Sequence, residues 1–530
     1  METDSFSYQK SGYFNSLIID YLNEKTELKE LYNRFPKLEN FKYQIEEKSK
    51  QFDSNNRNIL VNALDNQYNG FQISEQTKNN ITSLSNSTTY TITTGHQLNL
   101  FTGPLYFLYK IISTINLCKK LKEKYPGHNF IPVYWMATED HDFEEINHFN
   151  YKDVKIKWDK KSNCPVGRIK TEGIENIFKS FEIELGNGEI ANYLKDLFEK
   201  SYLKNSTLSH ATRFMVNALF GNEGLVIIDG DDCALKRLFI PIIKNELTER
   251  KSFEEISKTN DRFKNSYDLS VNPREINLFY IEDTIRERII FEKNEFKVNN
   301  TKLTFSENEI LNLVETNPEK FSPNVVLRPV YEELILPNLC YIGGGGEIAY
   351  WLQLKSVFDI YGVTFPILLI RNSVVIITEK QNKKANKLQV TWNDLFCNQT
   401  NLITLKTHEL SILPIDFSEL KYNLSQQFEK LLQITTQTDI SFLGAVKAQE
   451  KKQIKGLENL EKKLLKAEKR IHAEKLNQIM LLQNELFPNQ TLQERSVNFS
   501  EFYIKSNGTL IEKLIETLDP LEFNFTIITL

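Results

Sequence analysis

Cysteine and long apolar runs are scarce in this sequence, and each absence excludes a class of protein. The 530 residues include five cysteines, at positions 118, 164, 233, 340 and 397, and no two of them form a CxxC pair. Such scattered thiols exclude a disulfide framework and offer no zinc site of the usual His/Cys spacing. No apolar run approaches the roughly 18–20 residues that span a bilayer, and the first residues do not read as a secretion signal. We therefore expect a cytoplasmic protein with no membrane partner and no zinc.

The chain also has no excess of positive charge. Its 65 Lys and Arg residues against 70 Asp and Glu residues give a formal net charge of −5. Binding to nucleic acid without sequence preference needs a clear positive excess, so we expect no nucleic-acid partner. Hydrophobic residues make up 40% of the chain, as in an ordinary globular protein. At roughly 150 residues per domain, the length predicts about three or four domains.

The clearest structural pattern lies between residues 88 and 137. The β-branched residues 88–94 predict a strand, and a loop follows at 95–104, in which Thr102 is suited to cap a helix. Apolar residues at helical spacing then predict a long helix, and the apolar run 130–137 predicts a second strand. A strand, a helix and a strand in this order form a βαβ unit. This unit implies a parallel sheet whose ligands bind at the carboxyl ends of the strands.

The loop after the first strand contains Gly95-His96-Gln97. Backbone N–H groups between a strand and a helix N-terminus favour anions. An imidazole at such a place can hydrogen-bond a phosphate or donate a proton to a leaving group. The alternative is a turn histidine that is satisfied by the backbone.

The second strand runs into Glu139-Asp140-His141-Asp142, where three carboxylates flank one imidazole. Carboxylates in this arrangement hold the tautomer of the ring and raise its basicity, so His141 is a candidate base for an incoming amine. Two alternatives stay open. One is a metal site built from Asp140, His141 and Asp142, with or without His148, and the other is a solvated acidic turn that caps a helix.

Four consecutive glycines form a third cluster, Tyr341-Ile-Gly343-Gly344-Gly345-Gly346-Glu347. Glycines let the backbone approach a ligand closely, although this run is neither GxGxxG nor a phosphate loop ending in Lys-Ser/Thr. Arg328 lies upstream, and Arg371 ends an apolar run that predicts a strand at 365–371. Either guanidinium could hold a carboxylate or a phosphate with two hydrogen bonds. A plain flexible turn and two structural ion pairs are the alternatives.

The remaining segments complete the predicted organisation. Residues 224–229 and 373–378 also predict short strands, and we assign residues 1–380 to one α/β core. Two stretches, about 151–214 and about 276–360, interrupt the α/β pattern and are interpreted as insertions into its sheet.

The region 381–490 has a different character. Leu457, Leu460, Leu464, Ala467 and Ile471 follow spacings of 3, 4, 3 and 4, which is the seam of a coiled coil. Together with a preceding amphipathic helix, this seam predicts an antiparallel hairpin. One apolar face of the hairpin would remain for a second copy of the chain, so we expect a homodimer. Residues 491–530 are expected to return to the core.

Four stretches in one order resemble a known family: Thr94–Tyr106, Pro132–Phe143, Asn324–Tyr331 and Tyr341–Trp351. The sequence is similar to the bacillithiol biosynthesis cysteine-adding enzyme family, BshC, over nearly its whole length. The resemblance implies a Rossmann-like parallel-sheet core of the nucleotidylyl-transferase or class I synthetase type. It also implies two inserted connecting segments and a coiled coil that pairs two chains.

The implied activity is a ligase reaction that joins L-cysteine to the amine of glucosaminyl malate and so forms bacillithiol. The residues carried over by position are Gly95, His96, Gln97, Asn99 and Thr102 in the first loop, Glu139, Asp140, His141 and Asp142 in the second, and Arg328 and Gly343–Glu347 in the third. His96, Asp140, His141 and Asp142 are the candidate catalytic residues, and the others are candidates for binding. Glu332 departs from the expected pattern, because an amide is expected where this chain has a carboxylate.

Amide formation from a free carboxylate needs activation, so we expect ATP as co-substrate, with Mg²⁺ as its companion. The malate carboxylates of the acceptor suit Arg328 or Arg371. Two other functions stay open. One is a nucleotidyltransferase-like enzyme with another acceptor, and the other is a non-catalytic coiled-coil scaffold.

Overall fold

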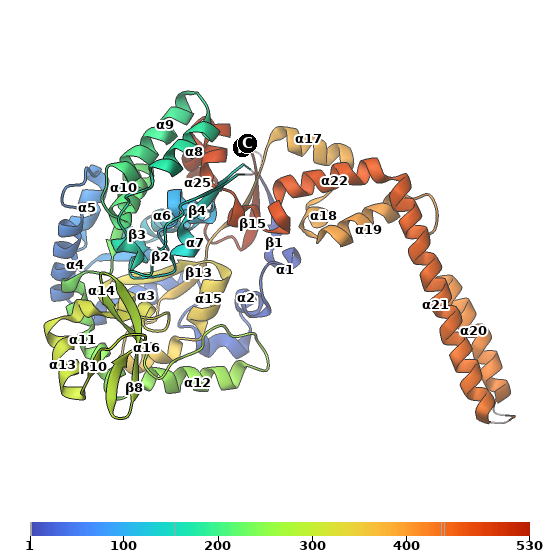
Figure 1. The fold of residues 1–530 in the computed structure, drawn as a ribbon, viewed down its shortest axis with the longest axis horizontal. Coiled ribbons are helices and arrows are strands. Elements are labelled where there is room, and N and C mark those ends of the chain that lie inside the picture. Colours follow the sequence, from blue (N-terminus) through green and yellow to red (C-terminus); the bar gives the residue numbers. More distant parts are fainter. Residues whose placement is uncertain (1–2, 153, 436, 439) are drawn as a thin grey trace.

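The computed structural model describes residues 3–152, 154–435, 437–438 and 440–530, and a five-stranded sheet lies at its centre (Figure 1). The spatial order of its strands is β13-β12-β2-β3-β6, and every neighbouring pair is parallel. Its strands are β2 (Thr89–His96), β3 (Asn129–Met136), β6 (Val226–Asp229), β12 (Asn338–Gly343) and β13 (Ile367–Ile370). The predicted parallel α/β sheet is confirmed.

This strand order places a reversal between β2 and β12. Numbered along the chain within this sheet, the strands read 3-2-1-4-5 from β6 to β13, as in dinucleotide-binding folds. From β2 the chain builds the sheet outward through β3 to β6, and from β12 it builds outward to β13 on the other side. The loops that leave the carboxyl ends of β2 and β12 therefore part in opposite directions and leave a crevice between them.

The strands are apolar because helices cover both faces of the sheet. Every residue of β2, β12 and β13 is buried, as expected for a parallel sheet between two layers of helices. The predicted long helix is α6 (Tyr106–Lys124), which packs against β2, β3 and β12. The preceding helices are α1 (Tyr8–Ser11), α2 (Ser16–Leu22), α3 (Asn40–Gln51), α4 (Ser54–Gln67) and α5 (Glu75–Ser83).

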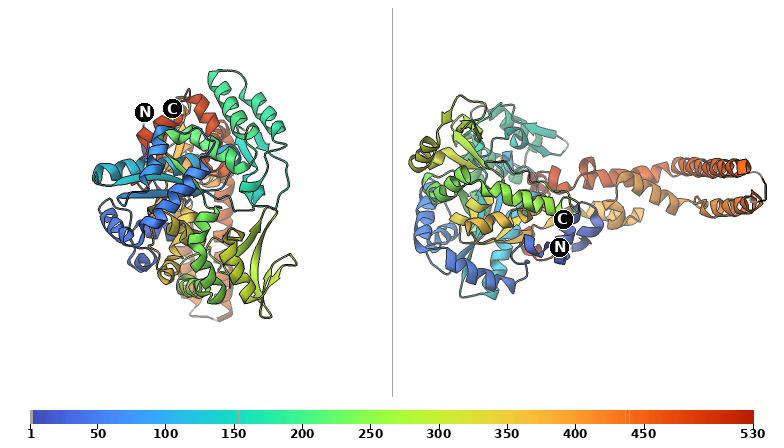
Figure 2. Two further views of the ribbon diagram at one scale, coloured as in Figure 1. Left: turned by 90° about the vertical axis from the view of Figure 1, so that its left-hand side faces the viewer. Right: turned by 90° about the horizontal axis from the view of Figure 1, so that it is seen from below.

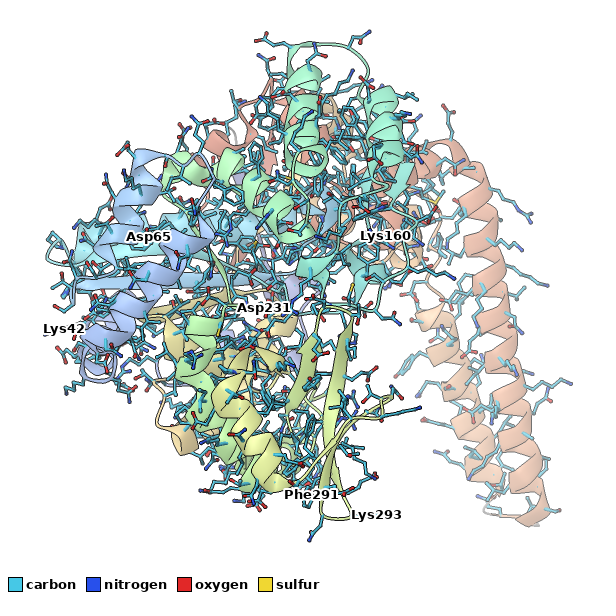
Figure 3. The ribbon with its side chains drawn as sticks, turned by 60° about the vertical axis from the view of Figure 1, so that its left-hand side comes forward. Lys42, Asp65, Lys160, Asp231, Phe291 and Lys293 are labelled. Atoms are coloured by element: carbon cyan, nitrogen blue, oxygen red, sulfur yellow. The ribbon has the colours of Figure 1, made fainter. Side chains whose placement is uncertain are left out.

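The predicted insertion at 276–360 is wrong in its extent. Its last part contains β12, a strand in the interior of the central sheet, so the inserted portion ends earlier. That portion is an antiparallel sheet of order β10-β9-β8-β7-β11. Its strands are β7 (Leu278–Glu282), β8 (Ile285–Glu292), β9 (Glu295–Val298), β10 (Thr304–Phe305) and β11 (Phe321–Pro323). Figure 3 marks Phe291 and Lys293 near the tip of this inserted sheet, far from Asp231 at the edge of the core.

Helices flank the inserted sheet and fill the segment between β3 and β6. The latter segment also contains a small antiparallel pair, β4 (His148–Tyr151) and β5 (Val154–Lys157). The helices between β3 and β6 are α7 (Phe143–Ile146), α8 (Glu175–Leu185), α9 (Glu189–Phe198) and α10 (Leu208–Phe220). Those between β6 and β13 are α11 (Cys233–Thr248), α12 (Lys251–Phe263), α13 (Glu307–Thr316), α14 (Arg328–Ile335), α15 (Gly345–Leu352) and α16 (Lys355–Tyr361).

A second sheet joins both ends of the chain. The strand predicted at 373–378 is β14 (Ser373–Ile377), which pairs in parallel with β15 (Asn524–Thr529). β15 in turn pairs with β1 (Thr3–Ser7) in antiparallel orientation. The segment leading to β15 contains α23 (Gln493–Ser496), α24 (Phe499–Lys505) and α25 (Leu510–Thr517).

A long helical arm projects from the core (Figures 1 and 2). It consists of α20 (Ser418–Thr435) and α21 (Ile440–Ile471), which pack against each other as the predicted antiparallel hairpin. α21 breaks at His472, and the chain continues as α22 (Ala473–Leu486). The base of the arm contains α17 (Glu379–Leu388), α18 (Trp392–Phe396) and α19 (Gln399–Leu410). Among the described residues, no helix has the length and apolarity to cross a membrane.

Candidate functional site

The predicted polar loops all lie at the carboxyl edge of the central sheet. The first loop leaves β2 at Gly95 and His96, and the glycine run leaves the neighbouring β12 at Gly343. The acidic loop follows β3, and Arg371 directly follows β13. The reversal of strand order lies between the first and third loops, which is where open α/β sheets bind ligands.

Lys110 of α6 connects the loops on either side of this reversal. Its ammonium donates to the Gly95 carbonyl at 2.7 Å and pairs with the Glu347 carboxylate at 2.6 Å. The Lys110 side chain is 3% exposed, and burial lowers its pKa although Glu347 opposes that shift. Glu347 also accepts from the Tyr341 hydroxyl at 2.9 Å and from the Gly344 N–H at 2.9 Å. One buried lysine thus fixes the first loop to the start of α15.

Half-buried Arg328 and fully buried Glu332 form a second pair within α14. Nη1 of Arg328 donates to Oε2 of Glu332 at 2.6 Å, and Nη2 donates to the Tyr350 hydroxyl at 3.2 Å. Burial raises the pKa of Glu332 to about 7, because the loss of hydration exceeds the attraction of Arg328. Its other oxygen, Oε1, has no hydrogen-bond partner in the described part of the chain. Glu332, which stands where an amide is expected, is therefore partly protonated near pH 7.

Arg371 forms a third buried pair, with Glu494 of the C-terminal segment. The two side chains are 5% and 2% exposed, and Nη2 of Arg371 donates to Oε1 of Glu494 at 2.7 Å. Nε of Arg371 has no partner among the described residues, and it would lie 3.7 Å from a Cβ added at Gly344. The guanidinium thus keeps one donor directed at the glycine run.

These three pairs and His96 form what we call the switch-point cluster: Lys110, Glu347, Arg328, Glu332, Arg371, Glu494 and His96. Tyr341 and Tyr106 connect its members, since the Arg328 guanidinium lies 5.7 Å from the Tyr341 ring and that of Arg371 5.1 Å from the Tyr106 ring. Several buried polar atoms around the cluster have no hydrogen-bond partner among the described residues: His96 Nε2, Asn99 Oδ1, Thr102 Oγ1, Tyr109 Oη, Glu332 Oε1, Trp351 Nε1 and Arg371 Nε. Most buried polar groups in folded proteins have a partner, and these are seven of the fifteen atoms that lack one among the described residues; at this place a ligand could supply it.

The imidazole of His96 is buried and neutral. It lies 5.2 Å from the Tyr106 ring and 5.0 Å from the Phe107 ring, measured between centroids. Burial, together with the charges of Lys110 and Arg371, holds its pKa well below the usual value. A neutral ring beside two cations can hydrogen-bond an anionic group without adding a further charge.

The first loop has an unusual backbone conformation. Phe101 and Thr102 have positive φ values of 47° and 65°, and Gly103 follows at 62°. Thr102 does not cap α6 as predicted, because the N-cap of that helix is Leu105. Instead, the Asn498 amide donates to the carbonyls of Phe101 and Gly103, at 2.8 and 2.6 Å. The C-terminal segment therefore holds this loop in a strained shape, as is common at functional sites.

The glycine run is needed for close packing and not for positive φ. None of Gly343–Gly346 is among the residues with positive φ. A Cβ at Gly343 would lie 2.9 Å from Glu347 Cβ, and one at Gly345 would lie 2.9 Å from a ring carbon of Phe14. A Cβ at Gly344 would meet Arg371 Nε and Glu347 only at ordinary contact distances, and one at Gly346 would meet nothing within 4 Å. Gly344 is therefore the position where a side chain would fill the crevice without disturbing the fold.

The acidic loop is joined to the first loop through Gln97. The Gln97 amide donates to Oδ2 of Asp140 at 2.9 Å and to Glu145 at 3.1 Å. Glu139 has a different role from its neighbours, because it is paired with the fully buried Lys236 of α11. Lys236 also donates to the Phe321 carbonyl at 2.6 Å. Glu139 thus anchors the loop to α11 and the inserted sheet, whereas Asp142 is exposed.

His141 lies at the exposed end of the acidic loop and meets the inserted sheet. Its Nδ1 lies 2.8 Å from Nη1 of Arg286 in β8 and 3.7 Å from Oδ1 of Asp140. The structure does not bring the His96 and His141 rings together directly, and their loops meet through Gln97 and Asp140. That both rings face one pocket stays a prediction.

Sequence patterns do not indicate Lys110, Arg286 or Glu494 as site residues. Lys110 lies among apolar residues of a helix, where a buried lysine is rare, and this was the one signal available. Arg286 and Glu494 lie far away in the sequence and reach the site only through the fold.

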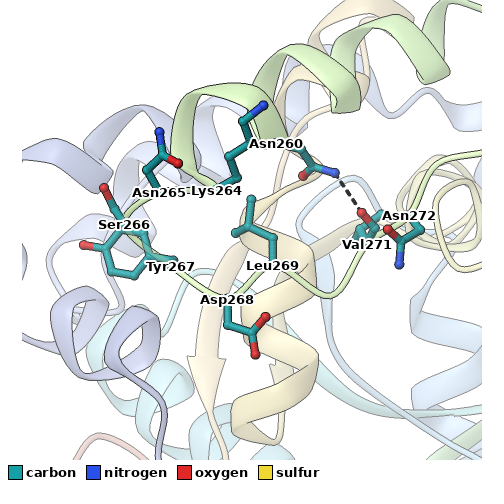
Figure 4. Close-up of a pocket in the computed structure, with 9 residues that line it drawn as sticks. All are labelled: Asn260, Lys264, Asn265, Ser266, Tyr267, Asp268, Leu269, Val271 and Asn272. Carbon is teal, nitrogen blue, oxygen red and sulfur yellow. Dashed lines mark hydrogen bonds between the residues drawn. The ribbon is translucent and has the colours of Figure 1, made fainter.

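A separate surface hollow of about 580 Å³ lies at the end of α12 (Figure 4). It is lined by Asn260, Lys264, Asn265, Ser266, Tyr267, Asp268, Leu269, Val271 and Asn272. The Asn260 amide donates across it to the Val271 carbonyl at 2.8 Å. None of the predicted site residues lines this hollow, so it is not the candidate site.

Comparison with known proteins gives matches over the whole chain. A family model described as "Bacillithiol biosynthesis BshC, N-terminal Rossmann-like domain" matches residues 1–372, and the corresponding "C-terminal coiled-coil domain" matches residues 374–530. A protein of Flavobacterium psychrophilum is 61% identical and covers 100% of this chain and 99% of its own length. A protein of Flavobacterium johnsoniae is 59% identical, with 100% of both chains covered. Both are named "Putative cysteine ligase BshC". A solved Campylobacter jejuni chain described as an arginyl-tRNA synthetase is 11% identical with a TM-score of 0.21, which carries no argument.

Proposed function

Because the chain belongs to the bacillithiol biosynthesis BshC family, we propose that it is the ligase that joins L-cysteine to the amine of glucosaminyl malate. The family supports the general reaction, a cysteine ligase that forms an amide bond. The finer assignments, which are the acceptor, ATP and the residues that bind them, are our proposal. They rest on one observation, the group of unpartnered buried polar atoms and paired cations at the switch point.

The proposed reaction has two steps. The cysteine carboxylate attacks the α-phosphorus of ATP, which forms an acyl adenylate and releases pyrophosphate. The neutral amine of the acceptor then attacks the acyl carbon, loses one proton and releases AMP. Both substrates carry anionic oxygens, and the buried cations of the switch-point cluster favour such groups.

Within the site, we assign anion contacts to His96, Arg371 and the glycine run. Nε2 of His96 and Nε of Arg371 are buried polar atoms with no partner among the described residues, and they suit phosphate or carboxylate oxygens. Gly344 lets the backbone lie against the same ligand. Arg328 is held by Glu332 and Tyr350, and its charge is available to the malate carboxylates when Glu332 carries its proton, which the rise of the Glu332 pKa to about 7 permits.

Mg²⁺ would enter this site with the phosphates of ATP. Carboxylate oxygens are the protein ligands that it prefers, and Asp140 and Asp142 at the rim fit that chemistry. Asp140 is already oriented by Gln97 at 2.9 Å and by the backbone N–H of His141 at 2.8 Å. Mg²⁺ would neutralise the charge of the phosphates, while the chain's own residues orient them.

Product analysis tests the proposed reaction. The protein is incubated with ATP, cysteine and glucosaminyl malate, each is omitted in turn, and the products are identified by mass spectrometry. We expect bacillithiol, AMP and pyrophosphate only when all three are present. ADP in place of AMP would rule out the adenylate, and pyrophosphate release without cysteine would favour a nucleotidyltransferase with another acceptor. No turnover of any substrate would favour a scaffold.

We also propose that two chains pair through the arm, in the cytoplasm. All five cysteines are free, as suits a reducing compartment. Leu460 and Ile471 of the predicted seam are 55% and 70% exposed in the single chain, and Leu420 beside them is 51% exposed. Leu420, Leu424, Leu457 and Leu460 line an apolar groove between α20 and α21 that a second copy can cover.

Light scattering tests this pairing. We expect the native chain to have twice its monomer mass and the variant Leu420→Glu/Leu460→Glu to be monomeric. Ile183→Glu is the control, because the Ile183 side chain is also exposed to solvent but lies on α8, outside the arm. A dimer that persists in the leucine variant would place the interface elsewhere.

A further inference from the structure

Arg286 reaches from the inserted sheet to the acidic loop of the core. Its side chain is 9% exposed, and the guanidinium lies 4.0 Å from the centroid of the Phe279 ring. Nε donates to the Ser322 hydroxyl at 3.3 Å and Nη2 donates to the Pro323 carbonyl at 3.3 Å. These contacts leave Nη1, which lies 2.8 Å from Nδ1 of His141. The inserted sheet therefore holds one N–H group directed at the imidazole.

This contact determines the state of the His141 ring. A guanidinium has only donors and stays charged in proteins, so Nδ1 must accept the hydrogen bond with its lone pair. The ring proton is then on Nε2, because a proton on Nδ1 would place two donors against each other. Oδ1 of Asp140 lies 3.7 Å from Nδ1 and 3.8 Å from Nη1 of Arg286, beyond hydrogen-bond distance of both.

We propose that Arg286 is a positioning residue that occupies Nδ1 of His141 and keeps the ring proton on Nε2, where the N–H binds an anionic oxygen of the substrate. This assignment replaces the role of general base, which needs a free lone pair, because the only lone pair of this tautomer is occupied. It rests on the proposed function for the identity of the ligand, a phosphate of ATP or a carboxylate. The geometry at Nδ1 does not depend on that identity.

Diethyl pyrocarbonate probes the lone pair without any turnover. It acylates an imidazole nitrogen only through a free lone pair, and the 45% exposed side chain of His141 is accessible to it. We expect His141 to react about tenfold faster or more in Arg286→Met than in the native protein, because a hydrogen bond to a charged group is worth about 1.5–3 kcal/mol. The rate is measured by mass spectrometry of the His141 peptide, relative to the exposed His408 of α19.

The acylation rates are compared at one pH in the native protein and in the variants. Arg288→Met, two residues away on β8 and exposed, is the matched control and should behave as the native protein. Equal rates in the native protein and Arg286→Met would overturn the proposal.

Two substitutions of His141 separate a donor from a base. Glutamine can donate a hydrogen bond but cannot act as a base, whereas phenylalanine can do neither. We expect His141→Gln to keep kcat/KM within about tenfold of the native value and His141→Phe to lose about 100-fold or more. Equal loss in both variants would restore the role of base. If KM for ATP rises most in His141→Phe, the bound oxygen belongs to a phosphate, and if KM for cysteine or the acceptor rises most, it belongs to a carboxylate.

The two kinds of failure remain distinguishable. Absence of all turnover in the native protein would refute the proposed function, and the acylation experiment would still decide the state of His141. Normal turnover with a fully reactive His141 would refute the role of Arg286 alone.

Discussion

The switch-point cluster and the arm differ in how completely one chain satisfies its own side chains. In the cluster, each of three cations faces a carboxylate of the same chain, and the pair Arg371–Glu494 is almost wholly buried. In the arm, apolar residues of the predicted seam remain exposed, and ion pairs such as Lys421–Glu461 are in contact with water. The core thus has charges that cannot be separated without large loss, whereas the arm has apolar residues that a second chain would cover in the proposed dimer.

Of the predicted changes, removal of Glu494 should lower the free energy of unfolding most. It also tests most directly whether the cluster and the arm differ. Glu494→Ala leaves the Arg371 charge buried without its partner and also removes an acceptor from the Val374 N–H at 3.1 Å. We expect a loss of about 3–5 kcal/mol in the free energy of unfolding, because an uncompensated buried charge is costly. Denaturant or thermal unfolding followed by circular dichroism measures it. Glu485→Ala at the exposed base of the arm is the control. A loss below about 1 kcal/mol would mean that the core pairs are no more important than surface pairs.

Glu332 should make the stability of the core depend on pH. Its pKa of about 7 in the folded protein lies above the ordinary 4.5, so the folded state holds this proton more tightly than the unfolded state does. The stabilisation that the Glu332 proton contributes should therefore be complete below about pH 4.5. It should be lost as the pH rises through 7, which lowers the free energy of unfolding by at most about 3 kcal/mol. Glu332→Gln has no such titration, so its melting temperature should exceed that of the native protein more at pH 8 than at pH 5.

Exposed Glu307 supplies the control for this comparison. Glu307→Gln should leave the difference between pH 5 and pH 8 as it is in the native protein. If Glu332→Gln also leaves it unchanged, the Arg328 charge, and not burial, dominates the pKa of Glu332.

Gly344 tests whether the crevice beside the cluster is used. Gly344→Val should leave the fold intact, because an added Cβ meets its neighbours only at ordinary contact distances and the φ angle of −74° suits any residue. We expect kcat/KM to fall about 100-fold, since a displacement of about 1 Å in a bound substrate has that effect. Gly346→Val is the matched control, two residues on and open to solvent. Equal turnover in both variants would mean that the glycine run is only a turn.

Local sequence patterns predict the strands and the loops of the site. The partners of the loop side chains come from long-range contacts, which no local pattern predicts. The runs 88–94 and 130–137 predict their strands well because parallel strands between helices are continuously apolar or β-branched. The sequence pattern does not indicate β12, because its residues Asn338–Gly343 include a buried amide. Asn338 bonds to Thr91 and Thr93 of the neighbouring strand and to Glu333 of α14. Likewise, the partner of His141 comes from a strand some 145 residues away, which no spacing reveals.

Removal of an ion pair in the arm should have the smallest effect on stability of all the predicted changes. Lys421 of α20 donates to Glu461 of α21 at 2.8 Å, and about a quarter of each side chain is exposed. Water already solvates both groups, so we expect Lys421→Ala to change the melting temperature by no more than about 2 °C and to leave the mass in solution unchanged. Differential scanning calorimetry and light scattering measure the two quantities.

The expected result follows from what remains after the substitution. Glu461 still accepts from the Phe417 N–H at 2.8 Å, so the two helices stay joined at this point. A large fall in melting temperature, or a shift to the monomer mass, would show that charge pairing and not the apolar groove holds the arm together. In that case the contrast between the core and the arm would be one of degree, since both would depend on ion pairs. If the change is small, the exposed apolar residues Leu420 and Leu460, and not this ion pair, are the residues expected to hold the proposed second chain.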